Sequence, residues 1–151
     1  FFMWDKYRHE NKQTICIIGV LILAAKLAKI DGEYSLLEEE EILKIIPHEP
    51  EQAIILRKIL NEAAEDDKSF EYDADRIKKL LDGDHPDFLE FIIAVLYKIA
   101  HSDHIYHEEE EKMIIKISDI FEIKEPFIDR LLASAKNITT YKLNFWSKQN
   151  A

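Results

Sequence analysis

Apolar residues dominate two long stretches of the chain. Residues 15–25 form an uninterrupted apolar run, and from there to about residue 30 only Lys26 and Lys29 are charged. A second, nearly all-apolar stretch begins at Pro86 and ends near His101. A helix that is apolar on all sides is typically buried. The pattern therefore predicts two central core helices, over about 13–30 and 86–101.

Shorter segments carry apolar residues on one face only, at the spacing of an amphipathic helix. Ser35 and Glu38 fit a capping box, which predicts a helix from there to Ile46. Apolar positions between 53 and 63 predict another over 51–64, followed by a polar connector over 65–72. Asp73 is predicted to cap a short helix that ends at 82–83.

The remaining helices follow the second core stretch. Acidic residues at 108–111 precede apolar positions up to Phe121, which predicts a helix with acids at its positive end. Pro126 is expected to begin a last helix that runs to about Lys136. No segment reads convincingly as a strand. We therefore expect an all-α, single-domain bundle of about seven or eight helices.

Length and composition agree with one helical domain. The chain has 151 residues, 47% of them hydrophobic, with 3 Gly and 4 Pro to supply tight turns. The 11-residue run at 15–25 is too short to cross a bilayer, which takes about 18 to 20 residues. The aromatic opening, Phe1 to Trp4, has two interpretations: a trimmed membrane-proximal segment, or side chains that pack on the bundle.

Charge and cysteine content narrow the partners. With 20 Lys and Arg against 30 Asp and Glu, the formal charge is −10, which excludes nucleic acid as an expected partner. An acidic surface favours cations or basic protein partners instead. Cys16 is the only cysteine and lies in the first apolar run, so it is expected to be inert packing in a reducing cytoplasm.

An internal repeat is the most specific feature of the sequence. Shifting the chain by 72 residues aligns 27–34 with 99–106, and Glu38-Glu39 with Glu110-Glu111. A core helix, an acidic turn and a Glu-led helix thus occur twice. The repeat predicts a pseudo-twofold arrangement of two helix hairpins.

These motifs resemble the TerB-like domain family. The family has an Ala-x-x-Asp-Gly turn, then a Ser or similar cap, and an acid seven residues after the Asp. These features are matched by Ala28, Asp31, Gly32, Ser35 and Glu38 in the first half, and by Ala100, Asp103 and Glu110 in the second. The second half departs from the family at His104, which stands where the family usually has Gly. The resemblance covers residues 13–136. Residues 1–12 are then a membrane-proximal N-terminal segment, and 137–151 a tail or linker.

Within this bacterial stress-response family, the chain is most similar to the central domain of DjlA-type membrane-anchored J-domain co-chaperones. That resemblance implies a non-catalytic scaffold on the cytoplasmic face of the inner membrane, which binds protein partners or clients. Hsp70 would be reached through a J-domain outside this chain, and the membrane only through a segment outside it. The alternative is a divalent-cation-binding domain of the tellurite-resistance type, without a chaperone role.

The tripeptide His85-Pro86-Asp87 matches the J-domain signature in composition but not in position. A J-domain carries it in an exposed loop after a long basic helix, whereas here it directly precedes a core stretch. We interpret it as the start of that helix, with Pro in its first turn.

The acidic turns are candidate cation sites. Carboxylates suit hard ions such as calcium or magnesium, and the candidate ligands are Asp31, Glu33, Glu38, Glu39, Asp103 and Glu110. The turns lack the alternating acids of an EF-hand loop. The competing interpretation is that these residues cap helices and face water.

Zinc is a weaker possibility, and no cofactor is required by any motif. His101, His104 and His107 recur every third residue, but across a predicted turn and not on one helix face. The sequence has no metalloprotease, nucleophile-elbow or phosphate-loop motif. An acid-pair hydrolase would need two carboxylates that converge in a pocket. We therefore expect no enzymatic activity.

Overall fold

The computed structural model describes residues 3–32, 36–46, 48–81, 86–101 and 108–124. Within these ranges every regular element is a helix and none is a strand, which confirms the expected all-α class. The elements in chain order are α1 (Met3–Tyr7), α2 (Lys12–Ala28), the 3-10 helix η1 (Lys29–Asp31), α3 (Leu36–Ile45), the 3-10 helix η2 (Pro50–Gln52), α4 (Ala53–Glu65), α5 (Phe70–Leu80), α6 (Pro86–Ala100) and α7 (Glu108–Ile120).

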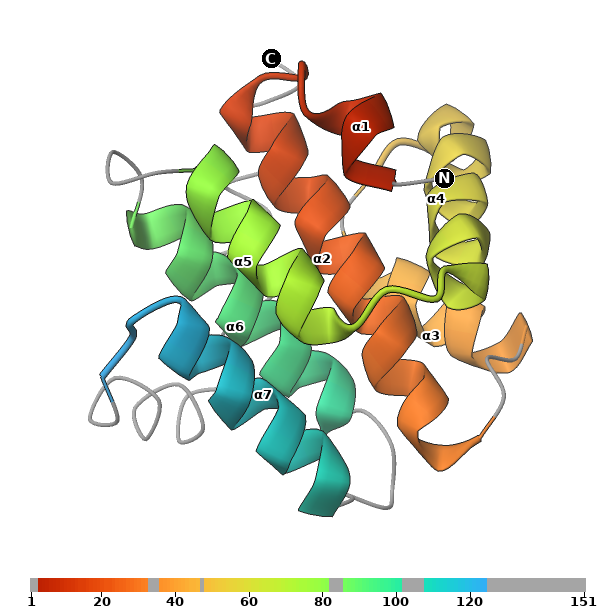
Figure 1. Ribbon diagram of the computed structural model, residues 1–151. Coiled ribbons are helices and arrows are strands. Elements are labelled where there is room, and N and C mark those ends of the chain that lie inside the picture. The colour runs from red at the N-terminus through yellow and green to blue at the C-terminus, as the bar shows by residue number, and fades with distance from the viewer. Residues whose placement is uncertain (1–2, 33–35, 47, 82–85, 102–107, 125–151) are drawn as a thin grey trace.

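Helix α2 is the centre of the bundle. Asn11 caps its start, since the Asn11 side chain accepts a hydrogen bond from the Thr14 backbone N–H at 2.8 Å. Every residue from Ile15 to Ala25 is buried, as the apolar run predicts. The helix packs against α4, α5 and α6, and Figure 1 shows it passing between them.

A glycine sets the distance between α2 and α5. A Cβ atom placed on Gly19 would lie 3.0 Å from the Cδ1 of Ile77, closer than side-chain carbons normally approach. The absence of a side chain at Gly19 therefore allows Ile77, which is fully buried, to pack directly on the α2 backbone.

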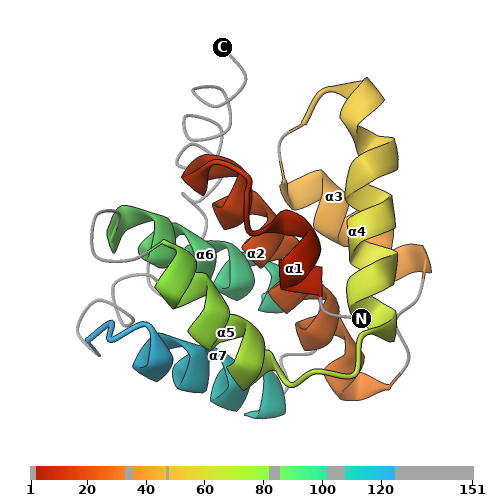
Figure 2. The same cartoon turned by 45° about the horizontal axis from the view of Figure 1, so that its top comes forward.

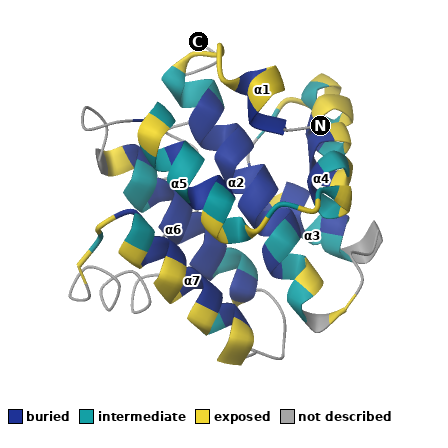
Figure 3. Ribbon diagram, in the orientation of Figure 1, coloured by how far each residue is buried: buried dark blue, intermediate teal, exposed yellow. Residues whose placement is uncertain are grey.

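Helix α6 is the second core helix, and α3 and α7 pack on it. Residues 91–97 are all buried. The outer helices bury one face each, as Figure 3 shows for α4 and α7, whose exposed residues lie away from α2 and α6. The predicted pair of buried helices with amphipathic helices around them is confirmed.

The helix bounds repeat with the period found in the sequence. Helix α2 ends at Ala28 and α6 at Ala100, while α3 begins at Leu36 and α7 at Glu108. Both pairs of positions are 72 residues apart. Figures 1 and 2 show the end of α2 and the start of α7 at the same end of the bundle.

The start of α5 differs from the prediction. Asp73 was expected to cap a helix after a polar connector, but the helix begins at Phe70 and Ser69 caps it, with the Ser69 hydroxyl accepting from the Tyr72 N–H at 3.1 Å. Asp73 lies one turn inside the helix and is buried. The Ser35 cap, the Asp82-Gly83 helix end and the helix expected after Pro126 lie outside the described residues.

A short helix that the sequence analysis did not predict precedes the bundle. In α1 the side chains of Met3, Trp4 and Tyr7 are buried, and the helix lies across α2 between α4 and α5 (Figure 2). This arrangement agrees with the second interpretation of the aromatic opening for Trp4, which packs on the bundle.

Candidate functional site

Glu39, one of the predicted cation ligands, takes its partners from α4. Its side chain is only 3% exposed, and one carboxylate oxygen accepts a hydrogen bond from Asn61 Nδ2 at 2.9 Å. The other oxygen lies 4.0 Å from the Nε of Arg57, whose guanidinium also pairs with Glu40 at 2.8 Å. Glu39 is therefore engaged in joining α3 to α4.

The other predicted acidic ligands lie at the starts of α3 and α7 or outside the described residues. Glu38 is half-buried near the start of α3, and Glu110 is 7% exposed in the first turn of α7. Asp31 belongs to η1, while the placement of its side chain, and of Glu33 and Asp103, is not described. Within the described part of the chain, no three acidic, His or Cys side chains form a group able to hold a metal ion.

The predicted histidine group is represented by His101 alone. His101 is exposed just after α6, and its ring stacks on Tyr97 with centroids 6.2 Å apart and planes 13° from parallel. His104 and His107 lie outside the described residues. The described residues thus show an aromatic contact for His101.

A buried ion cluster, which the sequence analysis missed, links α2 to α5. The Lys26 ammonium donates to Asp66 Oδ2 at 2.7 Å, to the Lys68 backbone carbonyl at 2.7 Å, and to Asp73 Oδ2. The three ammonium protons of Lys26 therefore have three acceptors. Trp4 completes the cluster, since its indole N–H donates to Asp73 Oδ1 at 3.1 Å.

Burial dominates the electrostatics of this cluster. It raises the pKa of the Asp73 carboxyl above its usual range, and the nearby Lys26 ammonium and Trp4 N–H oppose that rise by stabilising the ionised form. Because Lys26 is saturated with acceptors, it is suited to holding helices together and not to acting as a nucleophile. The detectable sequence signal was the charge itself, a lysine within an otherwise apolar helix.

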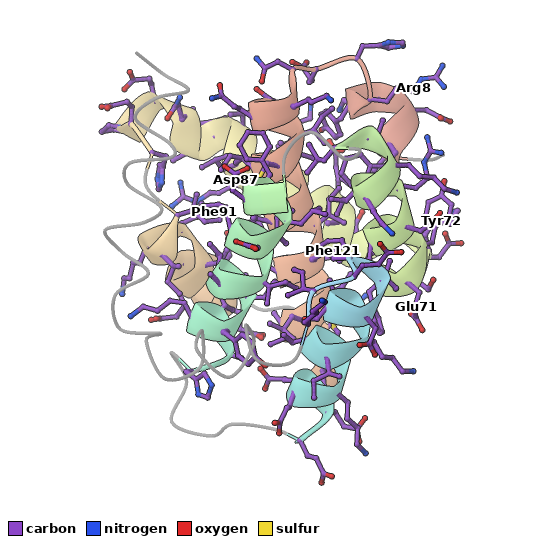
Figure 4. All side chains as sticks on the ribbon, turned by 90° about the vertical axis from the view of Figure 1, so that its left-hand side faces the viewer. Arg8, Glu71, Tyr72, Asp87, Phe91 and Phe121 are labelled. Atoms are coloured by element: carbon purple, nitrogen blue, oxygen red, sulfur yellow. The ribbon has the colours of Figure 1, made fainter. Side chains whose placement is uncertain are left out.

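Cys16 and the His-Pro-Asp tripeptide take the roles expected for them. Cys16 is fully buried and is a free thiol, and burial raises its pKa well above the usual value, so it is inert packing. Pro86 is the first residue of α6, and Asp87 is exposed in its first turn, one turn before the buried Phe91 (Figure 4). These two residues begin a core helix, as predicted.

The most exposed large apolar side chains of the described residues lie on the outer face of α4. Ile54 is 78% exposed and Ile55 is 47% exposed, whereas the inner face of α4 is buried. Helical spacing places Ile54 beside the exposed Glu51 and Lys58. We call this surface, made of Pro50, Glu51, Ile54, Ile55 and Lys58, the α4 patch. Among the described residues no helix is long and apolar enough to span a membrane.

Comparison with known protein families identifies the family of the chain. The model of a family described as tellurite resistance protein TerB matches residues 18–133, well over half of the chain. No curated protein and no solved structure matches the chain.

Proposed function

Because the chain belongs to the TerB family, we propose that it acts as a non-catalytic protein-interaction module, with the α4 patch as its binding surface. The observation that carries the proposal is the pair of adjacent isoleucines, Ile54 and Ile55, on the outer face of a helix whose inner face is fully used by the core. Burying a side chain of this size contributes roughly 1.5 to 3 kcal/mol, so two neighbouring ones provide an anchor for a partner.

The negative charge of the chain indicates that the partner segment is basic. The chain carries a formal charge of −10, and the acidic side chains of Glu49 and Glu51 are exposed next to the isoleucines. A negative field attracts basic segments and repels acidic ones. The proposed partner segment therefore presents an apolar side chain flanked by Lys or Arg.

The test begins with a photo-crosslinking amino acid at position 54 of the full-length protein in its native cell, to identify the partner. The affinity of the purified partner is then measured for the wild type, for the double variant Ile54→Ser and Ile55→Ser, and for the control Ile115→Ser. Ile115 is a suitable control because it is 40% exposed but lies on α7, away from the α4 patch. We expect the double variant to weaken binding at least about tenfold, or about 1.4 kcal/mol. An equal loss in the control variant, or none in the double variant, would contradict the proposal.

The more specific form of the proposal is a DjlA-type co-chaperone scaffold in the cytoplasm, at the inner membrane. It rests on the repeated Ala-x-x-Asp motifs and on the aromatic opening of the chain. The full-length sequence tests it: a membrane helix before Phe1 and a J-domain after Ala151 would support it, and their absence would favour a tellurite-resistance protein without a chaperone role.

A second candidate function, divalent-cation binding, is favoured by two buried carboxylates. Glu39 and Glu110 lie in the first turns of α3 and α7, the helices that follow the two acidic turns. Oxygen ligands of this kind suit calcium or magnesium. The candidate ligands are Asp31, Glu33, Glu38, Glu39, Asp103 and Glu110, and at Glu39 an ion would compete with the Asn61 amide.

Calorimetric titration of the metal-stripped protein with calcium, magnesium, manganese and zinc tests this second function. Micromolar binding that raises the melting temperature and is lost in Asp31→Asn or Asp103→Asn would support it, because a ligand of the folded state stabilises that state. Neither heat nor a shift in melting temperature with any of the four ions would count against it.

A further inference from the structure

Among the described residues, the contacts that hold helix α1 on the bundle are made by its side chains. It has five residues, too few for a helix to be stable in isolation, which takes roughly 12 or more. Its order therefore depends on the burial of Met3, Trp4 and Tyr7, of which Trp4 is 1% exposed. The burial of these three side chains contributes most of the free energy that holds α1 on the bundle.

The polar contacts of α1 connect it to the two helices on either side. Trp4 Nε1 binds Asp73 of α5. On the other side, the Lys6 ammonium lies 3.3 Å from Glu62 Oε1 of α4, and the Tyr7 hydroxyl lies 3.4 Å from Glu62 Oε2. Helix α1 thus covers the surface between α4 and α5, as Figure 2 shows.

The partners of these contacts do not depend on α1. If α1 departed, Asp73 would keep the Lys26 ammonium, which is also held by Asp66. Glu62 is partly exposed and would be hydrated. Leaving a buried polar group unpaired is the costly part of breaking a hydrogen bond, and this departure leaves none of these carboxylates in that state.

The connection to α2 also permits movement. Residues 8–11 are exposed, and Arg8 lies at the edge of the molecule (Figure 4). Asn11 caps α2 through its own side chain and needs nothing from α1. Helix α2 therefore keeps its start when α1 leaves.

We propose that α1 is a displaceable helix, which leaves the surface between α4 and α5 while the rest of the bundle stays folded. Its departure exposes the apolar area under Met3, Trp4 and Tyr7, flanked by the carboxylates of Glu62 and Asp73. This device is independent of the α4 patch and of cation binding, because it uses neither set of residues.

Two natural probes in the chain separate the movement of α1 from the opening of the core. Trp4 and Trp146 are the only tryptophans, so the full chain with Trp146→Phe reports on Trp4 alone, and Cys16 is the only thiol. Acrylamide quenching of Trp4, far-UV circular dichroism and thiol labelling of Cys16 are followed against denaturant. We expect Trp4 to become exposed at a lower denaturant concentration than that at which the circular dichroism signal is lost or Cys16 is labelled. Without denaturant, we expect Trp4 to be exposed at least tenfold more often than Cys16. Coincidence of the three transitions would overturn the proposal.

A charge variant gives an independent test in the same background. Glu62→Gln weakens both contacts of α1 with α4, whereas the control Glu65→Gln changes an exposed carboxylate at the end of the same helix. We expect Glu62→Gln to raise Trp4 exposure severalfold with Cys16 labelling unchanged, and Glu65→Gln to change neither. If Glu62→Gln raised both signals in proportion, α1 would belong to the same cooperative unit as the core, and the proposal would fail.

Discussion

The thiol of Cys16 faces the backbone carbonyl of Phe88, with Sγ and O 3.6 Å apart. The two residues are separated by 72 positions, the period of the internal repeat. Corresponding positions of the two halves therefore meet where α2 and α6 pack together at the centre of the bundle.

This position predicts the reactivity of Cys16. Because the side chain is fully buried and burial raises the pKa of the thiol, labelling requires opening of the core. We expect an aromatic disulfide reagent at neutral pH to label native Cys16 at least about 10³-fold more slowly than the unfolded chain. Complete labelling within minutes without denaturant would show that α2 packs on α6 more loosely than in the structure.

Lys26→Met tests the buried ion cluster. Removing the ammonium leaves Asp66 and Asp73 buried without their cation, and breaking such a pair costs about 3 to 5 kcal/mol. Urea unfolding at pH 7 measures this loss. The matched control is Lys29→Met, since Lys29 is exposed and its hydrogen bond within the described residues goes to the Ala64 carbonyl, so we expect a cost within about 1 kcal/mol.

The loss in Lys26→Met should depend on pH. Burial raises the pKa of the Asp73 carboxyl in the folded state, and removing Lys26 takes away the charge that opposes this rise above the unfolded value of about 4. A group of this kind favours the folded state fully below its unfolded pKa, and that contribution is lost as the pH rises through the folded pKa. The gap between wild type and variant should therefore narrow from pH 7 to pH 4. A constant gap would mean that the cluster is not the source of the effect.

Tyr7 predicts a change at the alkaline end. Burial raises the pKa of its phenol, and the neighbouring Glu62 carboxylate adds to the rise. The folded-state pKa then exceeds the unfolded value of about 10, so the contribution of Tyr7 is complete below pH 10 and is lost as the pH rises through the folded pKa. Docking of α1, followed through Trp4 fluorescence, should weaken in that range. Tyr7→Phe should remove this step, and its persistence in the variant would assign it to other groups.

The backbone conformation of Gly32 predicts that a side chain at this position lowers the stability of the protein. Its φ of 141° and ψ of −130° fall in a region that only glycine occupies readily. A Cβ atom at Gly32 would meet nothing within 4 Å, so any cost of Gly32→Ala is conformational and not steric contact with neighbours. We expect a loss of about 1 to 3 kcal/mol in thermal or urea unfolding. A neutral result would indicate that the turn adopts another conformation.

The backbone conformation of Glu122 predicts that glycine at this position is more stable than alanine. It follows α7 with a φ of 60°, and the N–H groups of Glu122 and Ile123 bond back to Asp119 and Ser118, the pattern of a Schellman motif. Glycine adopts this conformation without the cost that a side chain incurs. Glu122→Gly and Glu122→Ala both remove the ion pair with Lys78, so their difference isolates the backbone. The free energy of unfolding of Glu122→Gly should exceed that of Glu122→Ala by about 1 kcal/mol. The reverse order would contradict the motif.

The sequence predicted the parts of the fold that depend on local pattern. The two core helices and the Glu-led helix α7 lie where apolar spacing placed them, because helical periodicity is encoded within each segment. The cap of α5, which was predicted at Asp73 but lies at Ser69, shows the limit of such reasoning. Asp73 has the right chemistry for a cap, but its partner Lys26 is 47 residues away and only tertiary packing brings them together.

The candidate sites divide in the same way. The inertness of Cys16 followed from its position in an apolar run, whereas the partners of Glu39 come from another helix, α4, and no local motif announces them. Helix α1 escaped prediction because five residues carry too little periodicity, and because its order comes from the surfaces of α4 and α5. The exposure of Ile54 was likewise hidden, since its spacing is that of a core position.

The equal spacing of the helix bounds gives the two hairpins connections of the same length. Residues 29–35 and 101–107 are both seven-residue links between a core helix and an outer helix. Exchanging one link for the other would therefore leave the number of residues between a core helix and its outer helix unchanged. A chimaera with the 29–35 sequence in both places would carry the same acidic segment twice, so its properties could be compared with those of the natural pair of segments.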